Sequence, residues 1–265
     1  MGRRRLDAEL VRRGLAGSRA EAQEAVRAGH VTVRGAPATK STTLVGTDEA
    51  LVVGAPACGY VSRGGDKLAA ALDAFAVDPT GRDCLDAGAS TGGFTDCLLQ
   101  RGARHVVALD VGYGQLAWEL RTDPRVTVMD KTNVRELDLD LLPYRPSLVT
   151  ADLSFISLRL VVGPLVGVAE PLADLVLLIK PQFEVGREQV ERGGVVRDPG
   201  GWRRTIEEVA EATRAAGAAT LAVIASPVKG PAGNVEFLLH ARTAGEGSSL
   251  DIDSAIEAAE HAVAS

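Results

Sequence analysis

The stretch DCLDAGASTGGF, residues 83–94, joins a short apolar run to a glycine-rich loop and then to a helical pattern. Glycines at such a point permit a tight turn and a close approach of the backbone to a ligand. Ser90 occupies the place of the second glycine in a dinucleotide fingerprint, and no phosphate-loop lysine follows. The stretch therefore predicts a strand, a ligand-binding loop and a helix, without identifying the ligand.

Around this stretch, apolar runs alternate with helical patterns from about residue 82 onward, which predicts a doubly wound α/β sheet. The expected strands are Asp83–Ala87, His105–Asp110, Arg125–Asp130, Ser147–Asp152, Leu175–Lys180, Thr220–Ala225 and Glu236–His240. Ligands of open sheets lie outside the carboxyl ends of the strands. The first five strands end at or next to an ionisable residue, namely Asp86, Asp110, Asp130, Asp152 and Lys180. Any one of the four acids could be an ordinary helix cap, but five ionisable residues together indicate a site.

The acids after the first three strands favour a nucleoside cofactor. Asp110 follows Gly88 by 22 residues, where a carboxylate accepts ribose hydroxyls. Asp130, after Met129, could receive an adenine amino group, and Asp86 would lie near a methionine amino group. This layout resembles the Rossmann-like sheet of S-adenosylmethionine-dependent methyltransferases more than a dehydrogenase. The expected cofactor contacts are Asp86, Gly88, Ser90, Thr91, Gly92, Gly93, Phe94, Asp110, Met129 and Asp130.

The far side of the sheet indicates the acceptor of the methyl group. The turn Asp152-Leu-Ser-Phe155 lacks the prolines typical of base amino-group methylation, and none of Cys58, Cys84 and Cys97 is placed to attack a pyrimidine. A ribose hydroxyl instead needs a base in a cationic environment.

Lysines are scarce in this chain, five against 24 arginines. Of these two residue types, only lysine can lose its proton and act as a base, because arginine stays protonated. Lys67 and Lys180 are therefore candidates for the base. An exposed strand-end charge is the alternative interpretation of Lys180.

The first 60 residues form a basic module. They hold nine Lys/Arg and six Asp/Glu, whereas the remainder holds 20 and 29. A helix over residues 6–15, a second from the Ser18 capping box to Gly29, and strands at 30–33 and 51–53 are expected. A solvated surface would explain the charges, but their concentration favours phosphate contact. The candidate RNA-binding residues are Arg3, Arg4, Arg5, Arg12, Arg13, Arg19, Arg27, Arg34 and Lys40.

The module resembles the RNA-binding S4 domain, a small α+β fold. We expect an S4-like domain over residues 1–60, a linker at about 54–62 and a methyltransferase domain over 61–265.

Composition excludes several other classes of protein. Apolar residues make up 46% and charged residues 24%, as in globular chains, and the net charge is −6. The longest apolar run, Leu160–Ala169, is far shorter than the roughly 20 residues of a membrane span. No signal peptide, disulfide framework or metal site is expected from the N-terminus or the three cysteines. A cytoplasmic protein with no membrane partner is expected.

Five ordered motifs extend the resemblance to nearly the whole chain: SRGGDKL, DAGASTGGFTD, ADLSFISL, LIKPQFEVGR and GPAGNVEFLLH. They resemble the TlyA family, which joins an S4-like domain to an FtsJ-type methyltransferase domain and carries a haemolysin label. The resemblance implies S-adenosylmethionine as cofactor and 2′-O-methylation of cytidine in 16S or 23S rRNA, with rRNA or ribosomal subunits as partner. It also implies a catalytic tetrad of Lys67, Asp152, Lys180 and Glu236, with Lys180 as base; Glu236 rests on the resemblance alone.

Two alternative functions remain open at this stage, a pore-forming haemolysin and a non-catalytic ribosome-assembly factor. The oligomeric state is also open.

Overall fold

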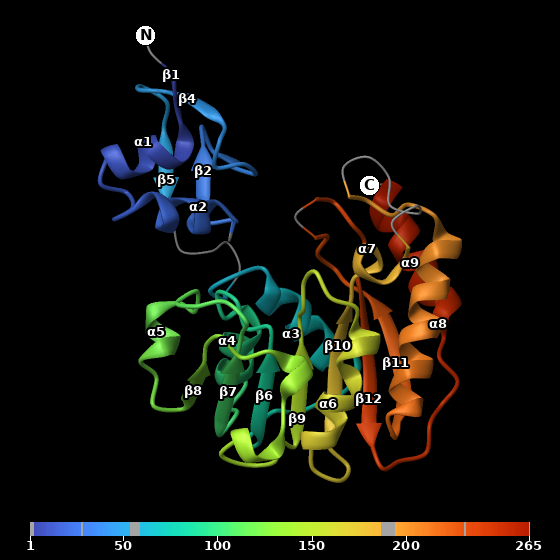
Figure 1. Ribbon diagram of the computed structural model, residues 1–265. Helices are drawn as coiled ribbons and strands as arrows, with labels where there is room; N and C mark the ends of the chain where they lie inside the picture. The colour runs from blue at the N-terminus through green and yellow to red at the C-terminus, as the bar shows by residue number, and fades with distance from the viewer. Residues whose placement is uncertain (1–2, 28, 54–58, 187–193, 231, 265) are drawn as a thin grey trace. The chain divides into compact units, whose positions relative to one another are not determined.

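The computed structural model describes residues 3–27, 29–53, 59–186, 194–230 and 232–264, in two compact units, Met1–Arg63 and Gly64–Ser265 (Figure 1). Most of the expected linker, residues 54–58 with Cys58, lies outside the described residues. Each unit has its own apolar core.

The described residues of the first unit form two helices and five short strands. The helices are α1 (Leu6–Arg12) and α2 (Arg19–Arg27), and the strands are β1 (Arg3–Arg5), β2 (Val31–Val33), β3 (Ala36–Pro37), β4 (Leu44–Gly46) and β5 (Leu51–Val53). The expected helix pair and the antiparallel pairing of β2 with β5 are confirmed. The small strands β1, β3 and β4 were not expected, because two or three residues carry too little alternation to detect.

The predicted cap of α2 differs in one contact. Ser18 Oγ accepts a hydrogen bond from the amide of Glu21 at 3.1 Å, as a capping box requires. The Glu21 carboxylate, however, accepts from the amide of Gly17 at 2.7 Å, one residue before the cap. The carboxylate therefore fixes the turn leading into the helix.

The second unit is built on a seven-stranded sheet in the order β11-β12-β10-β9-β6-β7-β8. The strands are β6 (Asp83–Ala87), β7 (His105–Leu109), β8 (Val126–Met129), β9 (Leu148–Ala151), β10 (Asp174–Ile179), β11 (Ala218–Ala225) and β12 (Phe237–Thr243). All seven expected strands are confirmed within three residues at their ends.

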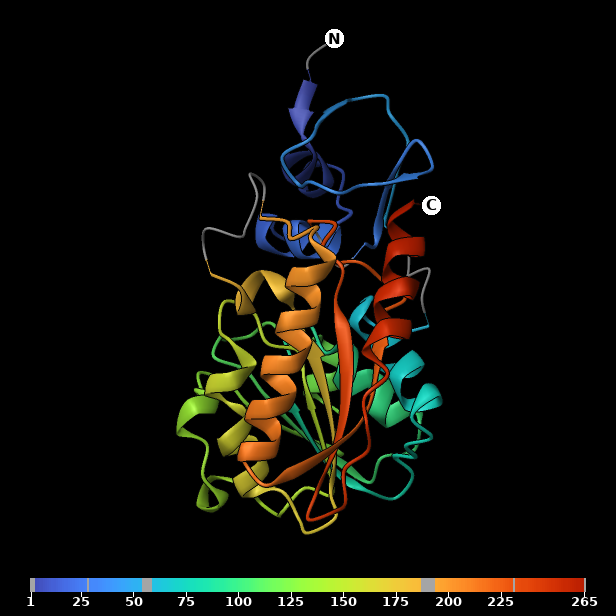
Figure 2. The same ribbon diagram turned by 90° about the vertical axis from the view of Figure 1, so that its right-hand side faces the viewer.

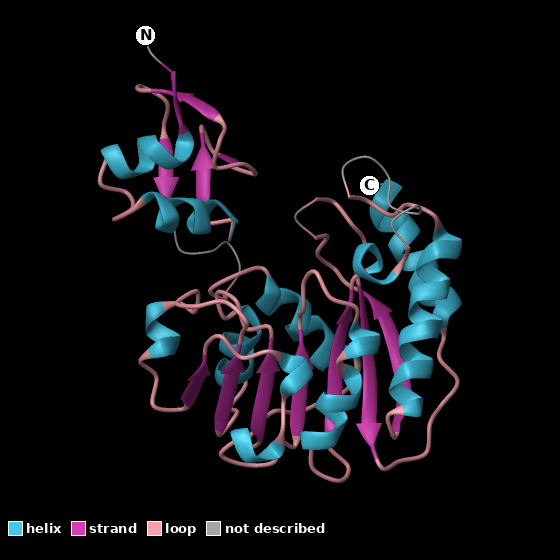
Figure 3. Ribbon diagram, in the orientation of Figure 1, coloured by secondary structure: helices cyan, strands magenta, loops and turns pink. Residues whose placement is uncertain are grey.

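Strand direction gives this sheet one functional edge. The five strands from β8 to β10 pair in parallel, and the first of them along the chain, β6, is the middle one of these five. Strand β12 is antiparallel to both neighbours, as Figure 3 shows by its arrow. The carboxyl ends of β6 and β9 therefore meet where the strand order reverses, and the start of β12 lies at the same edge.

Helices cover both faces of the sheet (Figure 2). On one face lie α3 (Gly64–Ala74) and α4 (Gly93–Gln100), and on the other lie α6 (Val162–Val168) and α8 (Pro199–Ala215). Helix α9 (Ile252–Ala264) packs against β11 and α8, and the one-turn helices α5 (Trp118–Arg121) and α7 (Pro181–Glu184) lie in connections. No helix within the described parts of the chain is both long and apolar enough to cross a membrane.

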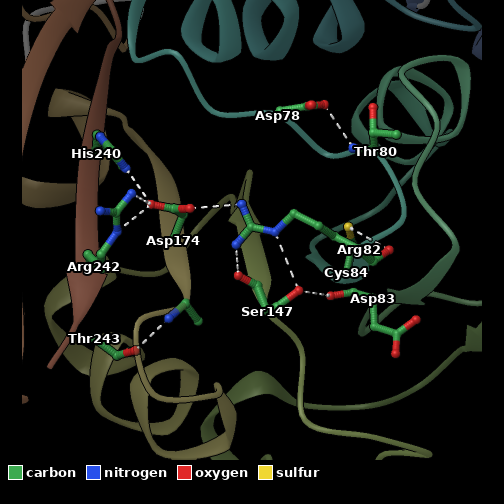
Figure 4. A network of polar contacts seen from close by, with 11 residues as sticks. Asp78, Thr80, Arg82, Asp83, Cys84, Ser147, Asp174, His240, Arg242 and Thr243 are labelled. Carbon is green, nitrogen blue, oxygen red and sulfur yellow. Dashed lines mark hydrogen bonds and ion pairs between the residues drawn. The ribbon is translucent and has the colours of Figure 1, made fainter.

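A polar network ties the strands together at the opposite edge (Figure 4). Asp174, the first residue of β10, accepts hydrogen bonds from His240 at 2.9 Å, from Arg82 at 2.8 Å and from Arg242 at 2.7 Å. Burial of the Asp174 carboxyl disfavours its charge, but these three donors outweigh it and hold its pKa below the usual range. The network therefore links β10, β12 and the residue before β6 in one charged cluster.

Replacing Asp174 with Asn should destabilise the second unit by about 3 kcal/mol at pH 7, because two arginines lose a buried anionic partner. Since the folded-state pKa of Asp174 is depressed, its contribution is present above the unfolded pKa and is lost as pH falls through the folded pKa. The difference between the variant and the parent should therefore shrink as pH falls from 5 to 3. Urea unfolding curves measure it.

The exposed pair of Asp73 with Arg101 offers the matched control. Asp73→Asn should lose under about 1 kcal/mol, because solvent screens an exposed ion pair. Equal losses for the two variants would show that the Asp174 cluster is not a stabilising centre.

Candidate active site

The glycine-rich loop after β6 has the backbone shape that its sequence predicts. Gly88 and Gly92 adopt the left-handed conformation, with φ of +87° and +101°, and Ser90 does so at +47°. A Cβ atom at Gly88 would lie 2.5 Å from the carbonyl oxygen of Asp152. The loop therefore touches the chain leaving β9, and this close approach requires glycine.

Asp110, directly after β7, has its carboxylate fixed by one amide of this loop and one amide of its own loop. Oδ2 accepts a hydrogen bond from the amide of Ser90 at 2.8 Å, and Oδ1 accepts from the amide of Gly112 at 2.6 Å. The side chain is only partly buried. An oriented, accessible carboxylate at the end of the second strand is suited to accept hydroxyl donors.

The acids after the neighbouring strands have other surroundings. Asp130 forms an ion pair with Arg121 at 2.6 Å, so one of its oxygens is already engaged. Asp86 is completely buried within β6 and accepts from Thr95 at 2.6 Å and from Thr150 at 3.3 Å. Burial raises the pKa of Asp86 to about 7, and the nearby charge of Asp152 adds to the shift. Its contacts tie β6 to α4 and β9.

The remaining expected cofactor residues lie along the same loop and on the next strand. Gly93 and Phe94 open α4 and are buried, and Thr91 is partly buried and accepts from the amide of Ala117 at 3.1 Å. Met129 ends β8, and its carbonyl accepts from the amide of Asp110 at 3.0 Å. The residues expected to bind the cofactor therefore lie at the carboxyl ends of β6, β7 and β8, in the loop after β6 and at the start of α4.

The four residues of the expected tetrad form two lysine–carboxylate pairs. Lys180 Nζ lies 2.6 Å from Asp152 Oδ1, and Lys67 Nζ lies 2.5 Å from Glu236 Oε2. Lys67 and Glu236 are buried, Lys180 is 9% exposed, and Asp152 is partly exposed. The contact of Lys67 with Glu236 is also a hydrogen bond, whereas Asp152 Oδ1 accepts no hydrogen bond from the described residues and meets Lys180 as an ion pair only.

Strand register explains how residues so distant in sequence meet. Leu177 pairs with Ala151 and Ile179 pairs with Phe237. Asp152 directly follows β9 and Lys180 directly follows β10. Glu236 directly precedes β12, which runs in the opposite direction, so all three residues stand at the same edge of the sheet. The first turn of α3 adds Lys67 through its ion pair with Glu236.

Two polar residues of this region were not anticipated from the sequence. Lys180 Nζ donates a hydrogen bond to Ser154 Oγ at 2.9 Å. The buried Glu184 accepts from Ser157 Oγ at 2.5 Å and from the amide of Leu158 at 2.7 Å, so α7 holds the loop that follows Asp152. Both lie in the quoted motifs, but a serine hydroxyl and an acid of a one-turn helix gave no chemical signal.

The nine candidate RNA-binding residues are spread over the first unit. Arg3, Arg4 and Arg5 form the exposed strand β1, Arg12 and Arg13 close α1, Arg19 and Arg27 begin and end α2, and Arg34 and Lys40 lie in loops. Many of them pair with acids. Glu49 faces Arg34 at 2.7 Å and Arg3 at 3.9 Å, and Arg27 pairs with Glu24. In each of these pairs the arginine side chain is the exposed partner, whereas the Glu49 side chain is nearly buried.

Arg13 differs from the other basic residues. It donates to the carbonyl groups of Gly46, Thr47 and Glu49 and pairs with Glu9. These contacts attach α1 to the turn after β4, so Arg13 has a structural role.

Comparison with known proteins identifies the family of each unit. Residues 60–243 match the FtsJ-like methyltransferase family and residues 4–50 match the S4 domain. A Mycobacterium tuberculosis protein, the 16S/23S rRNA (cytidine-2'-O)-methyltransferase TlyA, is 56% identical over 242 residues, covering 91% of this chain and 90% of that protein. Hemolysin A of Brachyspira hyodysenteriae is 38% identical over 89% of this chain and 98% of its own.

A solved structure supports the same relationship. A Streptococcus thermophilus protein with a hemolysin designation has a TM-score of 0.78 and 35% identity, covering 100% of this chain and 98% of that one. The resemblance inferred from the five motifs is confirmed. The chain belongs to the TlyA family of FtsJ-like methyltransferases and carries an S4 domain at its N-terminus.

Proposed function

We propose that the protein is an S-adenosylmethionine-dependent rRNA methyltransferase that modifies the ribose 2′-hydroxyl of a cytidine in 16S or 23S rRNA. The observation that carries the proposal is the pair of lysine–carboxylate contacts at the sheet edge that also bears the glycine loop. Methylation of an alcohol needs a group that removes its proton, and the edge supplies a lysine for this purpose. The relative named TlyA has the same activity in its name.

The residues at the carboxyl edge fit such a cofactor. The Asp110 carboxylate, held by two loop amides, would accept two ribose hydroxyls. Asp130 keeps one oxygen beyond its contact with Arg121 for an adenine amino group. Asp86 is completely buried and ties β6, which precedes the glycine loop, to α4 and β9 through Thr95 and Thr150. When bound, S-adenosylmethionine supplies an electrophilic methyl group on its sulfonium.

Lys180 then removes the proton from the 2′-hydroxyl. Asp152 and Ser154 hold Nζ from two sides, at 2.6 Å and 2.9 Å, so the amine points to one place. In its neutral form Nζ would accept the hydroxyl proton as the oxygen–methyl bond forms and the methyl–sulfur bond of the sulfonium breaks, which would leave a neutral thioether. Lys67, anchored by Glu236, adds a cation at the same edge that stabilises negative charge forming on the oxygen.

The first unit would bind the RNA that the second unit modifies. Eight of its nine basic residues, all except the structural Arg13, would supply the phosphate contacts, whereas the rest of the chain has a net charge of −9. This division assigns residues 1–60 to RNA binding and 61–265 to catalysis. A ribosome-modifying enzyme of this kind would work in the cytoplasm.

Transfer of a labelled methyl group to purified ribosomal subunits and to naked rRNA tests the proposal. Label should enter RNA from at least one substrate and only with the protein present. Absence of transfer from every ribosomal substrate, with binding retained, would favour a ribosome-assembly factor. Leakage of dye from lipid vesicles without S-adenosylmethionine would favour the haemolysin suggested by the name of one relative.

Replacing Lys180 with Arg should slow methyl transfer by about 10²–10⁴-fold, because arginine keeps the positive charge but does not act as a base. Binding of cofactor and RNA should change little. Single-turnover transfer and calorimetry measure the two effects. Lys229→Arg is the matched control and should leave the rate unchanged. A Lys180→Arg variant within tenfold of the parent would remove Lys180 as the base.

Replacing Asp110 with Asn should weaken cofactor binding by about tenfold or more, because hydrogen bonds to a charged acceptor contribute roughly 1.5–3 kcal/mol each. RNA affinity should be retained, since the phosphate contacts are assigned to the other unit. Calorimetric titration with S-adenosylhomocysteine checks the first effect. The exposed Asp140, replaced by Asn, is the control. Equal affinity for Asp110→Asn and the parent would place the cofactor ribose elsewhere.

A further inference from the structure

The first unit contains two completely buried carboxylates, Asp7 and Glu9, in the module proposed to bind RNA. Negative charge on such a surface opposes a polyanion, and burying a carboxylate has a further cost. Each acid therefore needs a reason to be there. Asp7 and Glu9 pair with different arginines, and these arginines differ in how exposed they are to solvent.

Asp7, in the first turn of α1, accepts hydrogen bonds from two arginines that lie on different elements. Arg5, on β1, donates to both carboxylate oxygens, from Nε at 3.1 Å and from NH2 at 2.8 Å. Arg19, the first residue of α2, donates to Oδ2 at 3.2 Å. The side chain of Gln23 and the amide of Ala8 complete the site, each at 2.8 Å. Asp7 therefore joins β1, α1 and α2 through one carboxylate.

The guanidinium groups around Asp7 remain accessible. The Arg5 side chain is 43% exposed and the Arg19 side chain is 57% exposed, although Asp7 is at 0%. A guanidinium has five N–H groups, and the paired contact uses two of those of Arg5. Both arginines can therefore bind a phosphate from the solvent side while Asp7 holds them from behind.

Glu9 provides the contrast within the same helix. It pairs with Arg12 at 2.6 Å and with Arg13 at 2.8 Å. The Arg13 side chain is only 20% exposed and bonds to three backbone carbonyls, so this acid serves the fold. Asp7 differs because both of its arginines face solvent.

We propose that Asp7 is a positioning residue that presents Arg5 and Arg19 as a preformed clamp for RNA phosphate. The proposal rests on the function proposed above. A long arginine side chain loses rotamer freedom when it binds a phosphate, and a carboxylate that already fixes the guanidinium removes part of that cost. Two arginines held side by side also suit the fork geometry of phosphate recognition.

The proposal predicts an effect opposite in sign to simple charge counting. Asp7→Asn removes one negative charge, so electrostatics alone would tighten RNA binding and steepen its salt dependence. If Asp7 positions the clamp, the same change should weaken binding about five- to tenfold. The log–log salt slope should fall by about 0.7–0.9 for each phosphate that the variant no longer binds.

The experiment measures binding of the full-length protein to the large and small ribosomal subunits between 50 and 300 mM KCl, well below the melting temperature. Asp48→Asn removes an exposed acid of the same unit and is the matched control; it should leave affinity unchanged or slightly tighter. In an Arg5→Ala, Arg19→Ala background, Asp7→Asn should have no further effect on affinity, because the groups that it positions are gone.

A second variant covers the case in which Asp7→Asn does not fold. Arg19→Lys keeps the charge at an exposed position but loses the planar fork, and it should weaken binding several-fold. Tighter binding by a folded Asp7→Asn variant, or unchanged binding by Arg19→Lys, would overturn the proposal. Failure of the unmodified protein to bind either subunit would instead overturn the proposed function.

Discussion

Parallel pairing of the strands from β8 through β10, with β12 reversed beside them, is the constraint on which the rest of the second unit depends. Parallel pairing brings the carboxyl ends of five strands to one edge, and reversal brings the beginning of β12 there as well. The glycine loop, Asp110, Asp152, Lys180 and Glu236 meet for this reason. The Asp174 cluster fastens β10, β12 and the chain before β6 at the other edge, so the register is fixed at both ends.

The two units use carboxylates for related purposes. In the second unit, Asp152 and Glu236 hold lysine amines at the carboxyl edge of the parallel strands. In the first, Asp7 holds guanidinium groups that face solvent. In both units a carboxylate converts a long, flexible cationic side chain into an oriented one, which reduces the entropy lost on binding. RNA binding and catalysis would therefore depend on the same physical effect.

Periodicity predicted the seven strands of the second unit, and strand-end chemistry predicted much of its site, because each of the first five strands ended at or next to an ionisable residue. Asp152 and Lys180 followed from that reasoning, and their contact is observed. Glu236 did not, because it precedes a strand whose reversed direction leaves no mark in the alternation of residues. The support from Ser154 and Glu184 depends on loop contacts that no local pattern encodes. In the first unit, charge alone did not distinguish the structural Arg13 from the solvent-facing Arg5 and Arg19.

The chemical position of the transferred methyl group tests the central claim most directly, because a lysine base is needed for a hydroxyl acceptor. Methylated rRNA should be digested to nucleosides and analysed by mass spectrometry with fragmentation. The account predicts 2′-O-methylcytidine, with the added mass on the ribose fragment and none on the base. A methyl group on the base would contradict the account, because the two lysine–carboxylate pairs would then have no part in activating the acceptor.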